Sequence, residues 1–99
     1  DWVTALSSTE VNASLQSGFW YSHFSGHGID YGRGSATAVY SDTSDVDAMS
    51  TSNIGLIINA MSCDISQLDL AGQCYTEHWI NNPVDGCAGI IGNTRYGWG

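Results

Sequence analysis

The chain contains no lysine, and Arg33 and Arg95 are its only Lys or Arg residues, against ten acidic residues and a formal net charge of −8. Proteins that bind nucleic acid need clusters of Lys and Arg to neutralise phosphates, so we expect no nucleic-acid partner. A surface this acidic instead favours solubility or cationic partners.

No apolar run approaches the length needed to cross a bilayer, and we therefore expect no membrane span. The three cysteines, Cys63, Cys74 and Cys87, include no CxxC pair, which argues against a zinc ribbon. We expect neither a metal nor a cofactor. The chain opens on Asp1 without a visible signal peptide, which suggests a processed or partial protein. Scarce lysine with abundant Ser, Thr, Gly, Asn and Trp favours an extracellular or cell-surface location.

Ninety-nine residues allow at most one domain, residues 1–99, and their patterns predict an α/β fold. The predicted strands are residues 19–24, 54–61 and 86–92, and the predicted helical segments are residues 9–16, a short helix within 41–50 capped by Ser44, and 75–81. Residues 29–35 are expected to be a Gly-rich loop, and residues 36–40 a short strand or an apolar loop anchor. Apolar and polar side chains alternate little in residues 19–24, which suggests a strand that is buried on both faces. The small apolar residues of 86–92 suggest a strand at the centre of the sheet. Because three strands cannot cover both faces of a parallel sheet, we expect further sheet elements upstream.

Reactive side chains follow two of these strands. The aromatic strand ends in a Ser-Gly-His-Gly turn that carries His27 between Gly26 and Gly28, and the second strand ends at Ser62 and Cys63. Sites in open α/β sheets form beyond the carboxyl ends of the strands, so the two side chains are expected at one edge. A histidine beside a cysteine lowers the thiol pKa and protonates a leaving amine. The backbone N–H groups of Gly28 and Cys63 are candidates for an oxyanion hole.

The sequence around these residues resembles the gingipain family of cysteine peptidases, within the caspase-like clan. The Ser-Gly-His-Gly turn is similar to the histidine turn of that clan, and residues 53–63 look like the family's nucleophile strand. Residues 74–79 resemble its next helix, and residues 89–95, with Trp98 beyond, resemble the following strand and pocket loop. Together these blocks cover residues 17–99 in the family's order.

This resemblance implies a caspase-like, mostly parallel sheet flanked by helices, of which the chain would form only the C-terminal part. It implies a cysteine endopeptidase with His27 as general acid and Cys63 as nucleophile. Gly28 would help form the oxyanion hole, and Trp98 would wall the pocket for the residue before the scissile bond, which in this family is often basic. The expected partners are a peptide or protein substrate and the rest of the same domain or another chain. The family's third catalytic carboxylate would lie upstream.

Other interpretations remain open from the residues alone. A gingipain-like sortase would pass the same acyl-enzyme to an amine, and a secreted non-catalytic domain would retain the fold without turnover. Cys63 is alternatively a buried structural thiol. His23 is expected to be either a core histidine with its hydrogen bonds made or a histidine that supports a neighbouring site residue. Asp42, Asp45 and Asp47 suggest helix capping and solvation more than calcium binding.

Overall fold

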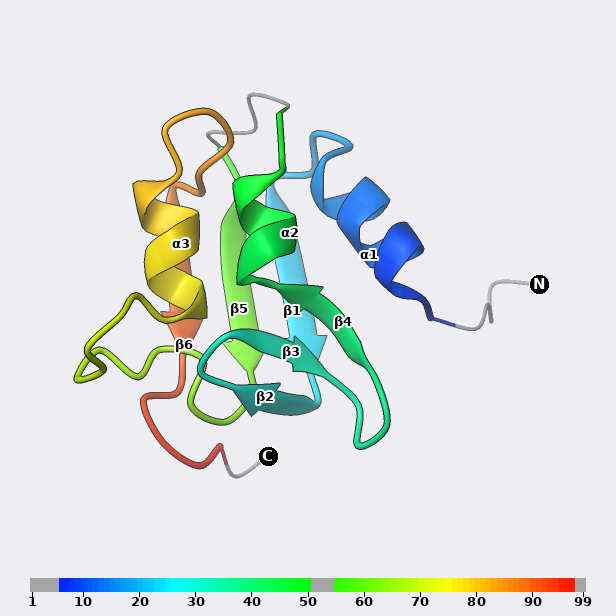
Figure 1. The fold of residues 1–99 in the computed structure, drawn as a ribbon. Coiled ribbons are helices and arrows are strands. Elements are labelled where there is room, and N and C mark those ends of the chain that lie inside the picture. Colours follow the sequence, from blue (N-terminus) through cyan, green and yellow to red (C-terminus); the bar gives the residue numbers. More distant parts are fainter. Residues whose placement is uncertain (1–5, 51–54, 98–99) are drawn as a thin grey trace.

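The structure is a computed structural model that describes residues 6–50 and 55–97, and Figure 1 shows its arrangement. In chain order the elements are α1 (Ser8–Leu15), β1 (Tyr21–Ser25), β2 (His27–Ile29), β3 (Gly32–Gly34), β4 (Val39–Asp42), α2 (Thr43–Asp47), β5 (Ile57–Met61), α3 (Tyr75–Asn81) and β6 (Gly89–Gly92). The predicted α/β class is confirmed, with a parallel three-stranded sheet and flanking helices that are compatible with part of a caspase-like domain.

The parallel sheet has the order β1–β5–β6. Its register pairs Tyr21 with Ile57 and Ser25 with Met61, so β1 and β5 end side by side. The prediction that residues 86–92 occupy the sheet centre is wrong, because β6 pairs only with β5 in the described sheet. The central strand is β5, whose alternate side chains Ile58 and Ala60 are fully buried.

A hydrophobic core lies between this sheet and the helices. Trp79 and Tyr75 of α3, Val46 of α2 and Leu15 of α1 are buried against the inward side chains of β5. Figure 1 shows α2 and α3 on the same side of the sheet. Full burial of an aliphatic side chain such as Ile58 stabilises the layer arrangement by about 1.5–3 kcal/mol.

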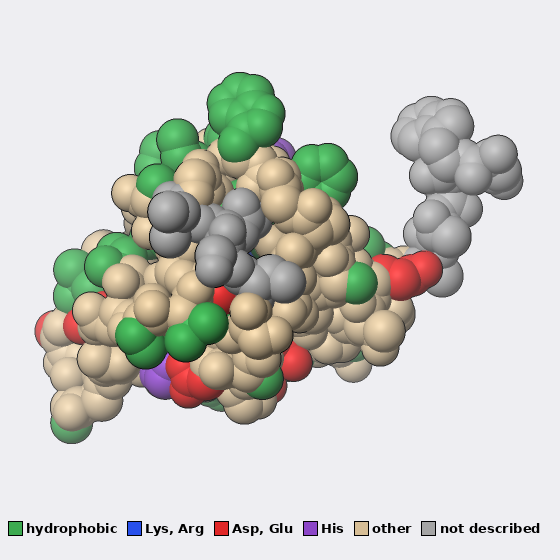
Figure 2. Space-filling model, turned by 90° about the horizontal axis from the view of Figure 1, so that it is seen from above, with side chains coloured by type: hydrophobic (Ala, Val, Ile, Leu, Met, Phe, Trp, Pro, Cys, Tyr) green, Lys and Arg blue, Asp and Glu red, His purple; other side chains and the backbone are tan. Residues whose placement is uncertain are grey.

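The opposite face of the sheet is exposed in the described residues. Tyr21, Ile57 and Ile91 retain exposed fractions of 49%, 40% and 64%. In Figure 2 hydrophobic side chains protrude along one side of the molecule. The expectation that residues 19–24 are covered on both faces is therefore wrong here, and so is the core placement of His23, which is exposed on this face. The physical reason is that the described helices cover one face only.

A second sheet, β2–β3–β4, is antiparallel. Its strand β4 overlaps the short strand considered for residues 36–40. Strand β3 lies within residues 29–35, which were expected to be a loop. That expectation is wrong because the glycines permit close strand approach instead of interrupting the strands. A Cβ atom added to Gly32 would lie 2.8 Å from the Ser41 carbonyl oxygen, and Gly34 is similarly pressed on the Ala38 backbone. Sequence patterning based on side chains does not detect strands this rich in glycine.

The short helix α2 begins two residues earlier than predicted. Its cap is Asp42 rather than Ser44: the Asp42 carboxylate accepts the Asp45 N–H, and the Asp45 carboxylate accepts the Asp42 N–H. The Ser44 hydroxyl donates to Asp42 at 2.6 Å. This bond and the Asp45 N–H hold the Asp42 pKa below its usual value. Capping thus accounts for two of the three aspartates considered for calcium. The predicted helix 75–81 is confirmed as α3.

None of the helices in the described part of the chain is long and apolar enough to span a membrane.

Candidate active site

His27 and Cys63 follow neighbouring parallel strands at matched positions. β1 and β5 end on the paired residues Ser25 and Met61, and each reactive residue lies two positions beyond its strand end. The Gly26 N–H donates to the Met61 carbonyl at 3.3 Å, which continues the pairing into the histidine turn. The structure therefore brings the two segments together at one edge of the sheet. His27 is also the first residue of β2, so the second sheet fixes the direction of the chain beyond it.

Gly28 makes the closest link between the two segments. A Cβ atom added there would overlap the Cys63 carbonyl oxygen and would lie 2.5 Å from the Ser62 Cβ and 2.8 Å from the Ile65 Cγ2. The backbone after His27 thus packs directly on the backbone of Cys63, without room for a side chain. A glycine is required here for space.

The loop that carries Cys63 is tied to the loop after β6. The Asp64 N–H donates to the Arg95 carbonyl at 2.9 Å, and the Ser66 N–H donates to the Asn93 carbonyl at 3.1 Å. The Asn93 side-chain amide donates to the Ser62 carbonyl at 3.2 Å. Three bonds on both sides of Cys63 therefore position its backbone.

The Cys63 side chain is half-buried, and its sulfur accepts a hydrogen bond from the Gly97 N–H at 3.3 Å. This bond fixes the position of the Cys63 sulfur relative to the loop after β6. The next residue, Asp64, has φ of 55° in the left-handed region, which is uncommon for a residue other than glycine. Such conformations concentrate where the chain turns sharply to present a side chain.

An exposed ion pair links the loop after Cys63 to the loop after β6. The Arg95 guanidinium donates two hydrogen bonds to the Asp69 carboxylate, at 3.0 and 2.6 Å. The bonds lower the Asp69 pKa and raise that of Arg95. Because both side chains are more than half exposed, the pair orients the loops more than it stabilises the fold.

The chain matches the model of peptidase family C25 over residues 1–99. The chain belongs to peptidase family C25. This is the gingipain family, and the resemblance predicted from the sequence blocks is thereby confirmed. Membership implies a cysteine peptidase. No curated protein and no solved structure matches the chain significantly.

The other two cysteines of this C25 member lie just before α3 and β6 rather than just after a strand of the parallel sheet. Cys74 is buried at the start of α3, and its N–H donates to the Glu77 carboxylate at 2.9 Å. Cys87 is half-buried and precedes β6 rather than lying in it. Burial raises the pKa of the Cys87 thiol, which keeps it protonated and weakly nucleophilic at neutral pH. Trp98, the predicted pocket wall, lies outside the described residues.

Sequence reasoning missed two residues that hold Cys63 in place, Asn93 and Gly97. A signal for Asn93 was available: it directly follows β6, so it lies at the same carboxyl edge as His27 and Cys63. No such signal marks Gly97, whose contribution is a backbone N–H.

Proposed function

We propose that this chain carries the nucleophile, Cys63, and the general acid, His27, of a cysteine endopeptidase. The observation that carries the proposal is the matched register of β1 and β5, with Gly28 packed on the Cys63 backbone. Two neighbouring strands then deliver a thiol and an imidazole to one edge of a sheet, which is the arrangement that nucleophilic catalysis requires. Membership of peptidase family C25 supports it independently.

In the proposed reaction the Cys63 thiolate attacks the carbonyl carbon of a peptide bond. The carbonyl oxygen becomes an oxyanion, for which the N–H groups of Gly28 and Cys63 are the proposed donors. The intermediate collapses with cleavage of the C–N bond, and His27 gives its proton to the leaving amine. Water then attacks the thioester and loses a proton to His27, and the intermediate collapses to the carboxylic acid and the Cys63 thiolate, which restores the starting state.

We further propose that the residue before the scissile bond is basic and that Trp98 walls its pocket. A formal net charge of −8 supports this, since an acidic surface attracts cationic substrates and raises their rate of encounter. The acidic and aromatic surface also fits the proposed extracellular or cell-surface location.

The proposed partner is the rest of the same domain. The exposed sheet face carries Tyr21, Ile57, Met61 and Ile91, all at least 40% exposed. Parallel sheets occur almost only with both faces covered, so a further layer is expected on this face in the working enzyme.

The proposal is tested by replacing Cys63→Ala and His27→Ala in the intact protein and measuring kcat/KM on peptides with Arg or Lys before the scissile bond. Both changes are expected to reduce kcat/KM by about a thousandfold or more. Cys87→Ala is the matched control, because its thiol is held protonated by burial. It should leave kcat/KM unchanged. Peptide cleavage that survives Cys63→Ala would overturn the assignment of the nucleophile.

Product analysis separates the endopeptidase from the sortase. With an added amine nucleophile, a hydrolase yields only the free acid, whereas a sortase yields the new amide. Labelling of Cys63 by an acyloxymethyl ketone that carries Arg or Lys would exclude the non-catalytic alternative. A folded intact protein that neither labels nor cleaves would support that alternative instead.

A further inference from the structure

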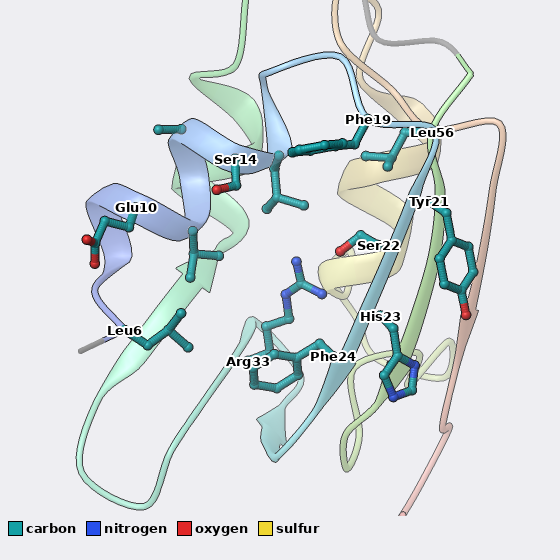
Figure 3. Close-up of a pocket in the computed structure, with 13 residues that line it drawn as sticks. Leu6, Glu10, Ser14, Phe19, Tyr21, Ser22, His23, Phe24, Arg33 and Leu56 are labelled. Carbon is teal, nitrogen blue, oxygen red and sulfur yellow. The ribbon is translucent and has the colours of Figure 1, made fainter. Parts of the chain in front are cut away.

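A cavity of about 710 Å³ lies between α1 and β1. Figure 3 shows its lining residues, with the Arg33 side chain directed into it from β3. Its walls are mainly apolar: Leu6, Val11, Leu15, Phe19 and Leu56. The volume falls in the range that accommodates small-molecule ligands. His27 and Cys63 are not among the described residues that line it, so the cavity is separate from the proposed active site.

Arg33 is the unusual member of this lining. It is only 2% exposed, and its Nε and Nη1 atoms have no hydrogen-bond partner in the described structure. Its contacts are aromatic: the guanidinium carbon lies 5.1 Å from the Phe24 ring centroid and 5.7 Å from that of Tyr75. Cation–π contacts offset part of the cost of burying a charge but satisfy none of the guanidinium N–H donors.

A buried arginine without a carboxylate is expensive, since the charge loses its hydration and gains no ion pair. The chain has ten acidic residues, yet the one acidic residue in the cavity lining, Glu10, is exposed, and its carboxylate accepts the Ser7 hydroxyl at 2.9 Å. An anion in the cavity would supply the partner that the described residues do not give to Arg33. Carboxylate is the group whose two oxygens match a guanidinium, and the apolar walls require an apolar body attached to it.

We propose that the cavity binds a small amphiphilic carboxylic acid, with its carboxylate on Arg33 and its apolar body between α1 and β1. Ser14 and Ser22 also line the cavity, and Figure 3 shows the Ser22 hydroxyl on the side of the Arg33 guanidinium, where a hydroxyl can donate to a carboxylate. This site lies beyond the proposed peptidase function and does not depend on it.

The test uses the intact protein, with octanoate as the probe and calorimetry as the measurement. Two matched compounds separate charge from apolar body: 1-octanol has the body without the charge, and acetate has the charge without the body. Octanoate is expected to bind about tenfold to a hundredfold more tightly than 1-octanol, as for one charge-assisted pair, and acetate should bind more weakly than octanoate. Equal affinities for octanoate and 1-octanol would overturn the proposal, and this comparison needs no variant.

Variants then locate the site. Arg33→Met keeps the side-chain length and should abolish the preference for octanoate, whereas Arg95→Met removes the other arginine and should preserve it. If Arg33→Met fails to fold, Arg33→Lys replaces it and should lower octanoate affinity, because an ammonium cannot bind both oxygens in a fork. A preference that persists in the folded Arg33 variant would refute the assignment. Absence of octanoate binding to the wild type would also refute it and would indicate that the intact protein supplies its own carboxylate to Arg33. Cys63→Ala should bind octanoate normally, so failure here and failure of the peptidase proposal are distinguishable.

Discussion

Replacement of Gly28→Ala should damage the proposed active site without removing any proposed catalytic side chain. The added methyl group would overlap the Cys63 carbonyl oxygen and would lie 2.5 Å from the Ser62 Cβ and 2.8 Å from the Ile65 Cγ2. Gly28 does not have a positive φ, so the cost is steric rather than conformational. The first contact is with backbone, which cannot rotate away as a flexible side chain can.

The magnitude follows from these contacts. Forcing one methyl group into a filled site typically costs about 1–3 kcal/mol. We expect the upper part of that range, because three atoms must move and the nearest belongs to the backbone of Cys63. Separation of the His27 and Cys63 segments by about 1 Å would lower kcat/KM by about a hundredfold. Both effects have a single cause and should appear together.

Chemical denaturation and peptide-cleavage kinetics of the intact protein measure the two effects. Gly89→Ala is the matched control: it lies in β6, and a Cβ atom there meets no heavy atom within 4 Å. That change should be neutral or stabilising by up to about 1 kcal/mol, with kcat/KM unchanged. If Gly28→Ala is as stable and as active as Gly89→Ala, then the packing of Gly28 on Cys63 does not hold the two strand ends together.

Two further changes test local features. Asp42→Ala should lower the free energy of unfolding by about 1 kcal/mol because it removes the α2 cap, whereas Ser44→Ala should lower it by less than about 0.5 kcal/mol. Chemical denaturation measures both values. A larger effect of Ser44→Ala than of Asp42→Ala would contradict the capping box of Asp42 with Asp45. Asp69→Asn should lower the melting temperature slightly at neutral pH and less at high salt, because its bonds to Arg95 are exposed. Since the Arg95 bonds lower the Asp69 pKa, their contribution is present above the ordinary pKa and disappears as the pH falls through the folded value. A difference in melting temperature that persists in strong acid would contradict this account.

The sequence predicts best the elements that have a clear pattern of apolar side chains or a residue that ends a helix. The strand that ends at Met61 and the helix at residues 75–81 were predicted because apolar runs and a following proline mark them. The antiparallel β2–β3 hairpin was missed, since Gly32 and Gly34 give it no side-chain pattern. The cap at Asp42 was misplaced by two residues because Ser and Asp both occur at caps, and only the hydrogen bonds distinguish them.

The sequence alone determined the chemistry available to this protein and where each reactive group lies along a strand. Ser-Gly-His-Gly after an aromatic run, Cys63 after an apolar one and the ordered blocks downstream together indicated the family, and the pattern of strands and helices indicated the fold class. Only the tertiary structure decided the register that aligns Ser25 with Met61, the packing of Gly28 on Cys63 and the burial of Arg33 beside a cavity. The register and the packing of Gly28 depend on backbone contacts between distant segments, and the burial of Arg33 depends on the aromatic side chains that the fold places around it. Backbone N–H and carbonyl groups are common to nearly all residue types, so the sequence does not show which of them will meet.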